Sequence, residues 1–467
     1  MSDSKSFLRT LLDKKGTGVT PDKHALFDAF AADPDTENLC KQILEFQNTL
    51  MANWQIKSRI ADINAQQVII PNGTVGKPYH AVIDFQKLGW KDVIETSVTG
   101  LEQLGLAYDP TAGTITGTPT ASGDNKLIFR YKLAGVAMEQ QERTIAIVIN
   151  PDPKSLWKNI PSPADGPYHK PDDMAVAGQL GDKRIVIASK RGRSHANVGS
   201  YRDDDFAYKH LDDTEWSVVA VADGAGSAKI SRKGSEIACN GIIDYFAANI
   251  PGEAFSEIDA ILKTHAEAKS DETQKKLSAF LYHNLGKAAL SVYKKLEEFA
   301  KTAETPIKDL HSTLIFALIK KYSFGYAILT FGVGDCPIGM MNKDKTEITL
   351  LNWLDVGEFG GGTRFITMPE IFQSPKFATR FGFRLVDDFS YLMLMTDGIY
   401  DPKFVVEANL EKIDNWNAFL ADLNGKNDEG IKVDFDPGNK DIASQLSAWM
   451  DFWSPGNHDD RTLAIIY

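Results

Sequence analysis

The sequence has little cysteine. Only three cysteines occur among 467 residues, namely Cys40, Cys239 and Cys336. They lie far apart and show neither the spacing of a metal site nor that of a redox motif. Small secreted domains that depend on disulfides are rich in cysteine, so this composition argues against a disulfide framework and predicts a reducing compartment.

Long apolar runs and a surplus of positive charge are also lacking. No stretch approaches the ~18 uncharged apolar residues of a membrane span, and residues 1–10 lack the apolar core of a signal peptide. We therefore expect a cytoplasmic protein with no membrane partner. Asp and Glu outnumber Lys and Arg by 63 to 51, and this surplus repels polyanions, so we expect no nucleic-acid partner.

The chain is longer than one hydrophobic core usually organises, and its pattern changes along its length. Residues 1–63 place apolar side chains at helical spacing, which predicts a helical N-terminal segment. Residues 64–150 alternate short apolar runs with Pro, Gly, Asn and Thr, as an all-β sandwich does. Six prolines lie between residues 151 and 173, so we expect a linker over 151–180 and a mixed α and β domain over 181–467.

One stretch of the β-rich region resembles a known family. Residues 106–120 combine a strand, an Asp-containing turn and a Gly-Thr-Pro turn, and in this they resemble the bacterial "putative Ig" family. The resemblance implies an Ig-like sandwich for residues 64–150, whose length suits such a fold. It is silent on function. We expect either a passive spacer or a module that docks a protein partner.

Aspartates stand at the ends of apolar runs in the C-terminal region. The runs and their aspartates are 216–222 before Asp223, 324–333 before Asp335, 391–396 before Asp397, and 461–467 after Asp459 and Asp460. A single Asp-Gly pair is more often a tight turn than a metal site. Adjacent strands lie only ~5 Å apart, however, so several such carboxylates would meet. Clustered carboxylates repel one another unless a cation neutralises them, and oxygen ligands favour Mg²⁺ or Mn²⁺ over zinc.

These motifs, in this order, resemble the metal-dependent serine/threonine protein phosphatases of the PPM, or protein phosphatase 2C, type. The best match is residues 222–226, Ala-Asp-Gly-Ala-Gly. Further matches are Asp203-Asp204, Ser312-Thr313, residues 333–336, residues 396–398 and residues 459–462, and a Ser194-His195 pair resembles a bacterial branch of the family. The resemblance implies a four-layer αββα sandwich, an α+β fold, for residues 181–467 of a multidomain and bacterial protein.

The resemblance also implies an activity and its ligands. The activity is hydrolysis of phosphoserine and phosphothreonine in proteins, as part of signalling with a cognate Ser/Thr kinase. Two Mg²⁺ or Mn²⁺ ions, with an optional third, would activate a water molecule. The implied metal residues are Asp203, Asp204, Asp223, Gly224, Asp335, Asp397 and Asp459.

Their implied roles differ. Asp223 would bridge both ions, and Asp397 and Asp459 would complete one of them. The Gly224 carbonyl, with Asp203 or Asp204, would help to hold the other. Asp335 would serve an outer shell or the optional third ion.

Two features of the family are missing. Many eukaryotic members carry a His two residues after the bridging Asp, whereas Ala225 stands here, so we expect His195, or else His458, to protonate the leaving group. The phosphate-binding Arg of the family corresponds to Gly199. A planar guanidinium pairs two phosphate oxygens, and the substitutes near this position are Arg191, Arg193 and Arg202, among which the sequence does not choose.

Other functions remain compatible with the sequence. Ala225 and the missing arginine would suit a catalytically weak pseudophosphatase that binds phosphoproteins or acts as a scaffold. A calcium-stabilised adhesin would also use Asp-Gly corners, but the lack of an export signal argues against it. The glycine-rich loop 357–362 is expected to form a mobile lid near the site, and residues 271–303 a core helix.

Overall fold

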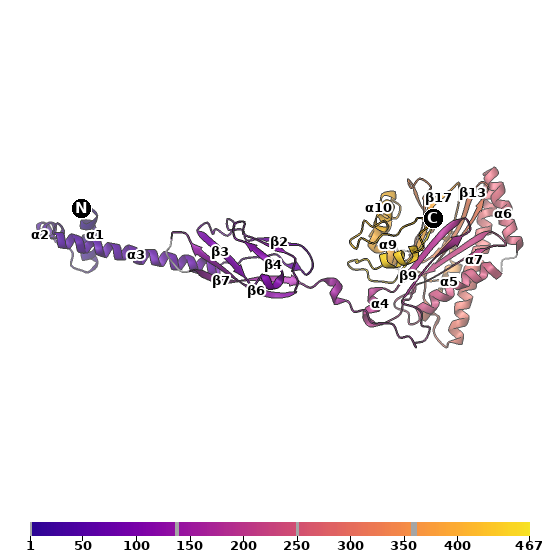
Figure 1. Cartoon of the computed structure of the whole chain (residues 1–467), viewed down its shortest axis with the longest axis horizontal. Helices are drawn as coiled ribbons and strands as arrows, with labels where there is room; N and C mark the ends of the chain where they lie inside the picture. Colours follow the sequence, from indigo (N-terminus) through magenta and orange to yellow (C-terminus); the bar gives the residue numbers. More distant parts are fainter. Residues whose placement is uncertain (1, 136–139, 249–251, 356–361) are drawn as a thin grey trace. The chain divides into compact units, whose positions relative to one another are not determined.

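The chain is described from a computed structural model, which covers residues 2–135, 140–248, 252–355 and 362–467. Figure 1 shows the whole chain. It divides into two compact units, Met1–Leu156 and Trp157–Tyr467, and each is described by itself.

The first unit begins with helices α1 (Ser2–Lys14), α2 (His24–Ala31) and α3 (Pro34–Ala65). The start of α3 is fixed by Asp33, whose side chain accepts the backbone N–H groups of Asp35 and Thr36. Pro34 suits the first helical position because it has no N–H to leave unsatisfied. A small core, formed by Leu8 of α1, Phe27 of α2 and Cys40 of α3, joins the helices.

Two sheets follow in the same unit. Their strands are β1 (Gly73–Thr74), β2 (Tyr79–Val82), β3 (Val93–Thr99), β4 (Leu106–Asp109), β5 (Thr114–Gly117), β6 (Gly123–Leu133) and β7 (Gln141–Asn150). The sheet orders are β1-β7-β6-β3 and β2-β5-β4. Alternate side chains of β6 and β7 are buried around Trp90, and Ile63 at the end of α3 is part of this core. This is the β-rich unit that the sequence predicts, and its Ig-like character stays a prediction.

The second unit contains two larger sheets. Their strands are β8 (Asp173–Leu180), β9 (Lys183–Lys190), β10 (Asp205–Leu211), β11 (Trp216–Ala222), β12 (Leu314–Tyr322), β13 (Gly325–Val333), β14 (Ile338–Asn342), β15 (Ile348–Leu350), β16 (Phe381–Val386), β17 (Phe389–Met395) and β18 (Arg461–Ile466). The sheet orders are β10-β11-β12-β13-β16 and β15-β14-β17-β18-β9-β8. Strands such as β11 are apolar and buried along their whole length, because both of their faces are covered.

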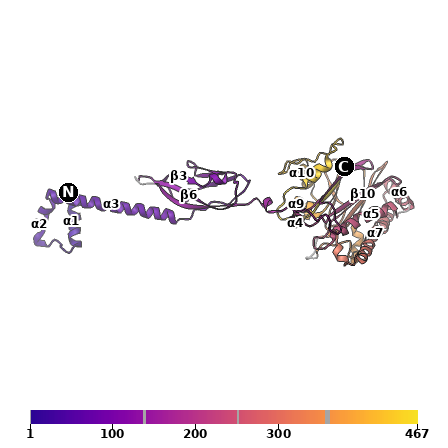
Figure 2. The same cartoon turned by 60° about the horizontal axis from the view of Figure 1, so that its bottom comes forward.

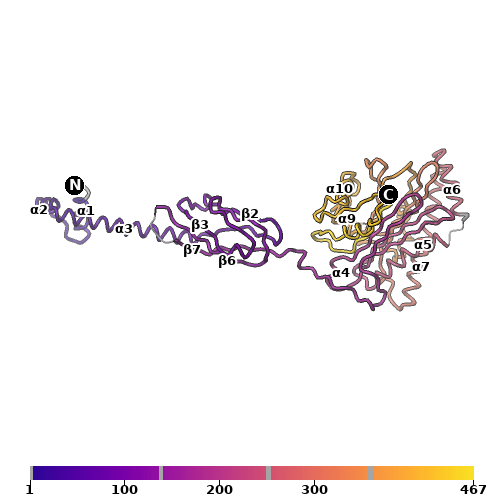
Figure 3. Tube along the Cα trace, in the orientation of Figure 1, coloured from indigo at the N-terminus to yellow at the C-terminus, as the bar shows by residue number. Residues whose placement is uncertain are grey.

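Helices cover the outer faces of the two sheets. They are α5 (Ser231–Ala248), α6 (Gly252–Glu267), α7 (Asp271–Thr302), α8 (Glu370–Gln373), α9 (Asp397–Phe404), α10 (Ile413–Leu423) and α11 (Ile442–Trp449), and a further short helix, α4 (Arg193–Val198), follows β9. One apolar cluster joins α5, α6 and α7 to the five-stranded sheet, a second joins α9, α10 and α11 to the six-stranded sheet, and a third lies between the sheets. The layers are therefore helix, sheet, sheet and helix, and the chain path through them can be followed in Figure 3. The mixed α and β domain predicted from the sequence is confirmed.

The boundary of this unit differs from the sequence prediction. The linker was expected to extend to residue 180, but residues 173–180 form β8, which pairs along its whole length with β9. The proline-rich part ends at Pro171. β8 is an edge strand rich in alanine and only half-buried, so it lacks the apolar run by which the central strands are recognised.

None of the helices in the described part of the chain combines the length and the apolar character that a membrane span requires.

Candidate active site

The aspartates of the predicted site lie at the ends of strands. In the five-stranded sheet, β11 and β13 both run antiparallel to β12, so they end at the same edge. Asp223 follows β11, and Asp335 follows β13. In the six-stranded sheet, β18 runs antiparallel to β17, so Asp459 before β18 and Asp397 after β17 also share an edge.

Asp204 connects the edges of the two sheets. Asp203 and Asp204 precede β10, whose first residue pairs with the last residue of β11. The Oδ2 atom of Asp204 accepts hydrogen bonds from Thr396 at 2.9 Å and Thr462 at 2.7 Å, and both threonines belong to the six-stranded side. The two carboxylate-bearing edges therefore face the same space. The structure brings together all of the predicted metal residues at this end of the sheets.

Asp223 and Asp335 lie close together at the five-stranded edge. Ligand atoms of Asp223, Asp335 and Cys336 all lie within 4.8 Å of one another. The backbone N–H of Asp223 donates to Thr313 Oγ1 at 2.8 Å, which fixes the corner after β11. Thr363 donates to Oδ2 of Asp335 at 2.8 Å. Among the described residues, Asp335 Oδ1 and Asp397 Oδ1 are buried without any hydrogen-bond partner.

Burial, and then the crowding of these carboxylates, raises their pKa values. Burial raises the pKa of Asp223 well above its ordinary value, and the negative charges of Asp397, Asp204, Asp459 and Asp335 add to the effect. Burial and the neighbouring charges likewise raise the pKa of Asp397 to about 7. Like charges and burial make the ionised form of such a carboxyl group unfavourable, and a bound cation removes this cost.

The outer members of the group behave in the same way. Burial raises the pKa of Asp203 to about 6, with the charge of Asp460 as the next cause. Burial, followed by the charge of Asp460, raises the pKa values of Asp204 and Asp459 as well. The pKa of Asp335 is raised mainly by burial.

Gly224 is fixed by the close approach of another backbone. A Cβ atom at this position would lie 2.4 Å from the carbonyl oxygen of Asp203, so only glycine fits. Gly224 also forms an isolated β-bridge with Ser312. The corner after β11 is thus held against the segment before β10, with Gly224 between Asp223 and Asp203.

His195, on α4, is held by Asp460. Its Nδ1 atom lies 3.0 Å from Oδ1 of Asp460, and its Nε2 atom lies 3.8 Å from Oδ2 of Asp203. Burial alone would lower the pKa of His195, but the carboxylates of Asp460, Asp203 and Asp459 together raise it to about 9. The ring therefore carries a proton at neutral pH.

Asp460 was not among the predicted site residues. It accepts the backbone N–H groups of Gly192 and Asp203, each at 2.5 Å, in addition to its contact with His195. Burial alone would raise the pKa of Asp460, but these hydrogen bonds and the His195 charge hold it below its usual range. Its oxygens are therefore occupied by protein donors, which leaves the neighbouring Asp459 as the carboxylate that can bind a cation.

The three arginines considered as phosphate ligands have other partners. Arg191 forms an ion pair with Asp172 at 3.0 Å. Arg202 is buried and donates to the carbonyls of Pro171 and Asp204 and to Ser189. Arg193 donates to the Asp451 carbonyl and lies over the Trp453 ring. The phosphate ligand therefore stays unassigned.

The predicted lid over 357–362 lies outside the described residues, except for Gly362.

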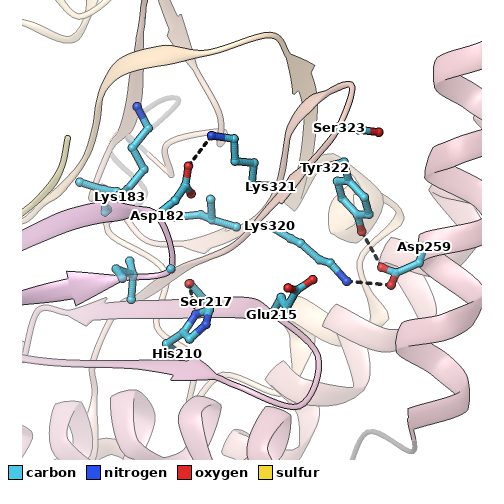
Figure 4. Close-up of a pocket in the computed structure, with 14 residues that line it drawn as sticks. Asp182, Lys183, His210, Glu215, Ser217, Asp259, Lys320, Lys321, Tyr322 and Ser323 are labelled. Carbon is cyan, nitrogen blue, oxygen red and sulfur yellow. Dashed lines mark hydrogen bonds and ion pairs between the residues drawn. The ribbon is translucent and has the colours of Figure 1, made fainter.

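A separate cavity of about 770 Å³ lies at the opposite end of the sheets (Figure 4). It is lined by the turn between β8 and β9, the start of β11 and the end of β12. Lys320 pairs there with Asp259 at 2.8 Å, and Lys321 pairs with Asp182 at 2.7 Å. Because these lysines are already neutralised and none of the predicted site residues lines the cavity, we place the chemistry at the carboxylate end.

The donor set fits hard divalent cations. In the group of Asp223, Asp335 and Cys336, the atoms that converge are carboxylate oxygens apart from the Cys336 sulfur, and the second group is Asp459, Asp460 and His195. Two buried carboxylate oxygens, of Asp335 and Asp397, lack partners among the described residues. Such ligands suit Mg²⁺ or Mn²⁺, which bind carboxylates and carbonyls. Burial raises the pKa of Cys336 well above its ordinary value, so its thiol is neutral and a poor ligand.

A further carboxyl group missed by the sequence analysis is Asp401. It lies one helical turn after Asp397 on α9, and burial is the main cause that raises its pKa, with the charge of Asp335 contributing. The spacing of four residues after the Thr-Asp-Gly motif was the available signal, because residues i and i+4 share one helix face.

Comparisons with known proteins address the same region. The family described as "Protein phosphatase 2C" matches residues 191–446. No curated protein matches the sequence. Similar solved structures include the serine/threonine phosphatase Stp1 from Staphylococcus aureus, with 12% identity over 64% of this chain and 98% of that chain and a TM-score of 0.34. The catalytic domain of the phosphatase PstP, in complex with two manganese ions, has 14% identity over 61% and 97% and a TM-score of 0.37. RsbX in complex with magnesium has 13% identity over 63% and 98% and a TM-score of 0.33.

Proposed function

Because the chain belongs to the protein phosphatase 2C family, we propose that its second unit is a metal-dependent phosphatase that hydrolyses phosphoserine and phosphothreonine in proteins. The observation that carries the proposal is the convergence of Asp204, Asp223, Asp335, Asp397 and Asp459 at one end of the two sheets. Such a group of buried carboxylates disfavours its own ionisation, and cation binding removes that penalty.

We assign the cation ligands by position. Asp223 lies at the five-stranded edge and is affected by the charges of Asp397 and Asp459 of the other edge, so it would contribute to holding both cations, and Asp397 and Asp459 would help to hold one of them. The Gly224 carbonyl and the segment of Asp203 and Asp204 would hold the other. When bound, two divalent ions would supply charge stabilisation for the transferring phosphoryl group and would lower the pKa of an attacking water.

The chain's own residues would position the carboxylates and protonate the leaving group. Thr396 and Thr462 orient Asp204, and Thr313 fixes the corner at Asp223. His195 presents its Nε2 atom towards the carboxylate group while Nδ1 is anchored on Asp460. We propose that its Nε2 proton passes to the oxygen of the departing serine or threonine, which a general acid at this place would do.

The activity is tested with the whole chain. Phosphate release from a phosphoserine peptide should require Mn²⁺ or Mg²⁺ and should stop in EDTA. The physical reason is that the carboxylates alone repel the phosphate dianion. If the folded, Mn²⁺-loaded protein binds the peptide and releases no phosphate, the chain is a binding module and the proposal is wrong.

The role of His195 has its own test. His195→Gln should lower kcat for a phosphoserine peptide by about 100-fold or more, since general acid catalysis contributes roughly 10²–10⁴. The same variant should lose far less activity on p-nitrophenyl phosphate, whose leaving group needs no proton. Steady-state kinetics on both substrates give the two ratios.

His458→Gln is the matched control. Burial lowers the pKa of His458, so its ring is neutral and cannot supply the proton. Its substitution should affect the two substrates equally. Equal losses on both substrates in His195→Gln would instead show that His195 only supports the structure of the site.

Two kinds of partner are proposed, one for each unit. We propose that the substrate is a phosphoprotein produced by a Ser/Thr kinase, and that residues 64–150 form an Ig-like module that docks a protein partner. The two sheets that share a core around Trp90 support the sandwich fold of that module. In a pull-down with the full chain, the partner should still bind when the catalytic aspartates are mutated. It should no longer bind when residues 64–150 are deleted.

A further inference from the structure

The middle of helix α3 is exposed to solvent on nearly all sides. Every residue from 41 to 55 except Leu44 is exposed. The start of α3 packs on α1 and α2 through Thr36 and Cys40, and its end packs on the sheets through Ile63. Figure 2 shows α3 as one continuous helix between these contacts.

This exposed part carries large apolar side chains. The exposed fractions are 57% for Leu39, 42% for Ile43, 74% for Phe46, 68% for Leu50 and 67% for Trp54. Their spacings of four, three, four and four residues place them on one face of the helix, which we call the α3 stripe. The stripe and Ile63 point in different directions, so the sheets of the same chain do not cover it.

An exposed apolar stripe of this length is expected to be buried against a partner. A helix of about 15 residues without tertiary contacts is marginal in water, and helices in proteins are stabilised mainly by burial of an apolar face. Single exposed apolar residues need no explanation, but a continuous row of five is typical of an interaction surface.

We propose that the α3 stripe pairs with the α3 stripe of a second copy of the chain, with the two helices antiparallel. The stripe is nearly symmetric about the midpoint between Phe46 and Gln47. An antiparallel pair centred there places Leu39 of each copy opposite Trp54 of the other, and Ile43 opposite Leu50. Both copies then bury the same five side chains in an isologous interface.

The charges that flank the stripe favour this orientation. Asp35 and Lys57 lie just beyond its two ends, on the same side of the helix, and both are exposed. In the antiparallel pair, Asp35 of one copy faces Lys57 of the other at both ends. A parallel pair would set Asp35 against Asp35 and Lys57 against Lys57, and would align the two helix dipoles.

The available area is sufficient for a dimer. Aromatic side chains can bury about 150–250 Å² each, so the five partly exposed side chains of one copy offer on the order of 500 Å². Two copies would then bury roughly 1,000 Å² in total, close to the lower end of specific interfaces. The proposal is independent of the phosphatase activity.

The first experiment measures the mass of the full chain in solution. Light scattering after size exclusion at micromolar concentration should give a dimer. Leu50→Glu should raise the dimer Kd by more than about 100-fold, because each interface would lose two buried leucines and gain two charges. Asn48→Glu, which adds the same charge on the opposite side of the helix, should leave the Kd unchanged.

Circular dichroism and phosphatase activity check that both variants are folded, which exposed positions favour. A wild-type chain that is monomeric under these conditions overturns the proposal. So does a Leu50→Glu variant that dimerises as tightly as the wild type.

The second experiment tests the orientation. When the Ile43→Cys and Leu50→Cys proteins are mixed under mild oxidation, a disulfide should form between the two variants. Each variant alone should form few disulfide-linked dimers. The wild-type chain, which retains Cys40, is the control. Asp35→Lys and Lys57→Asp should each weaken the dimer, and the double variant should restore it. Efficient self-linking of Ile43→Cys alone would show a parallel pair and overturn the antiparallel assignment.

Discussion

Asp223→Asn should remove nearly all of the Mn²⁺-dependent phosphatase activity. Asp223 lies at the five-stranded edge within reach of the charges of Asp397 and Asp459 on the other edge, and an amide carries no charge with which to hold a cation. Loss of an outer hydrogen-bond partner of a metal ligand costs roughly 10–100-fold, so loss of a shared ligand should exceed about 100-fold. The measurements are phosphate release from a phosphoserine peptide and Mn²⁺ binding by calorimetry, and both should fall together.

The same variant should be more stable than the wild type when metal is removed. The pKa of Asp223 is raised well above its ordinary value, mainly by burial and then by the charge of Asp397. Ionising Asp223 in the folded protein is therefore costly at neutral pH, and asparagine avoids the cost. In EDTA, the midpoint of thermal unfolding of Asp223→Asn should rise by several degrees.

Asp182→Asn is the matched control for the loss of activity and of Mn²⁺ binding. Asp182 makes an ion pair with Lys321 at the opposite end of the sheets, and its side chain is 41% exposed. Its replacement should leave metal-dependent activity and Mn²⁺ binding unchanged. If Asp223→Asn kept its activity, or if it lost activity while destabilising the metal-free fold, the assignment of Asp223 would be wrong.

The carboxylates could be anticipated from the sequence because each adjoins an apolar run. The run 216–222 is buried along its whole length, and this is why it is continuous enough to be recognised. Asp223 follows directly, so the end of the strand fixes the place of the side chain. The prediction that the chain belongs to the protein phosphatase 2C family is confirmed, since that family matches residues 191–446.

The partners of these carboxylates could not be anticipated in the same way. Asp460 contacts His195, which lies 265 positions earlier in the chain, and no local pattern carries such a contact. Arg202 was a candidate phosphate ligand, yet it is buried against Ser189 and the Asp204 carbonyl. Charge and spacing alone do not tell whether an arginine faces a ligand or the protein.

The helical segment shows a different limit. Leu39, Ile43, Phe46 and Leu50 recur at helical spacing, which predicts a helix, and α3 spans them. Periodicity predicts that one face is apolar, but it does not say what covers that face. Here the chain's own sheets and helices leave it exposed, which becomes evident only from the fold.

Metal-free protein should become more stable as the pH falls from 8 to 5, the opposite of ordinary acid denaturation. The pKa values of Asp397 and Asp203 are raised to about 7 and about 6, mainly by burial. A carboxyl whose folded pKa lies above its unfolded value binds its proton more tightly when folded. The penalty of its charge is therefore present at pH 8 and disappears as the pH falls through 7 and 6.

His195 acts in the same direction, because its raised pKa favours folding once the ring is protonated in both states. The pKa of Asp460 is lowered, so its contribution is lost only below the tested range. In EDTA, the unfolding midpoint of the wild type should thus rise between pH 8 and 5.

Saturating Mn²⁺ should reverse this trend. Bound cations favour the ionised carboxylates, and ligand at about 100 times its Kd adds about 2.7 kcal/mol to the free energy of unfolding. For a unit as large as Trp157–Tyr467 that corresponds to a rise of about 4 °C at pH 8, shrinking towards pH 5 as protons compete for the same oxygens. Differential scanning fluorimetry across this range, with and without Mn²⁺, gives both curves. Asp223→Asn should show neither the Mn²⁺ effect nor the full rise in EDTA, and two parallel curves for the wild type would mean that protons and cations do not share this site.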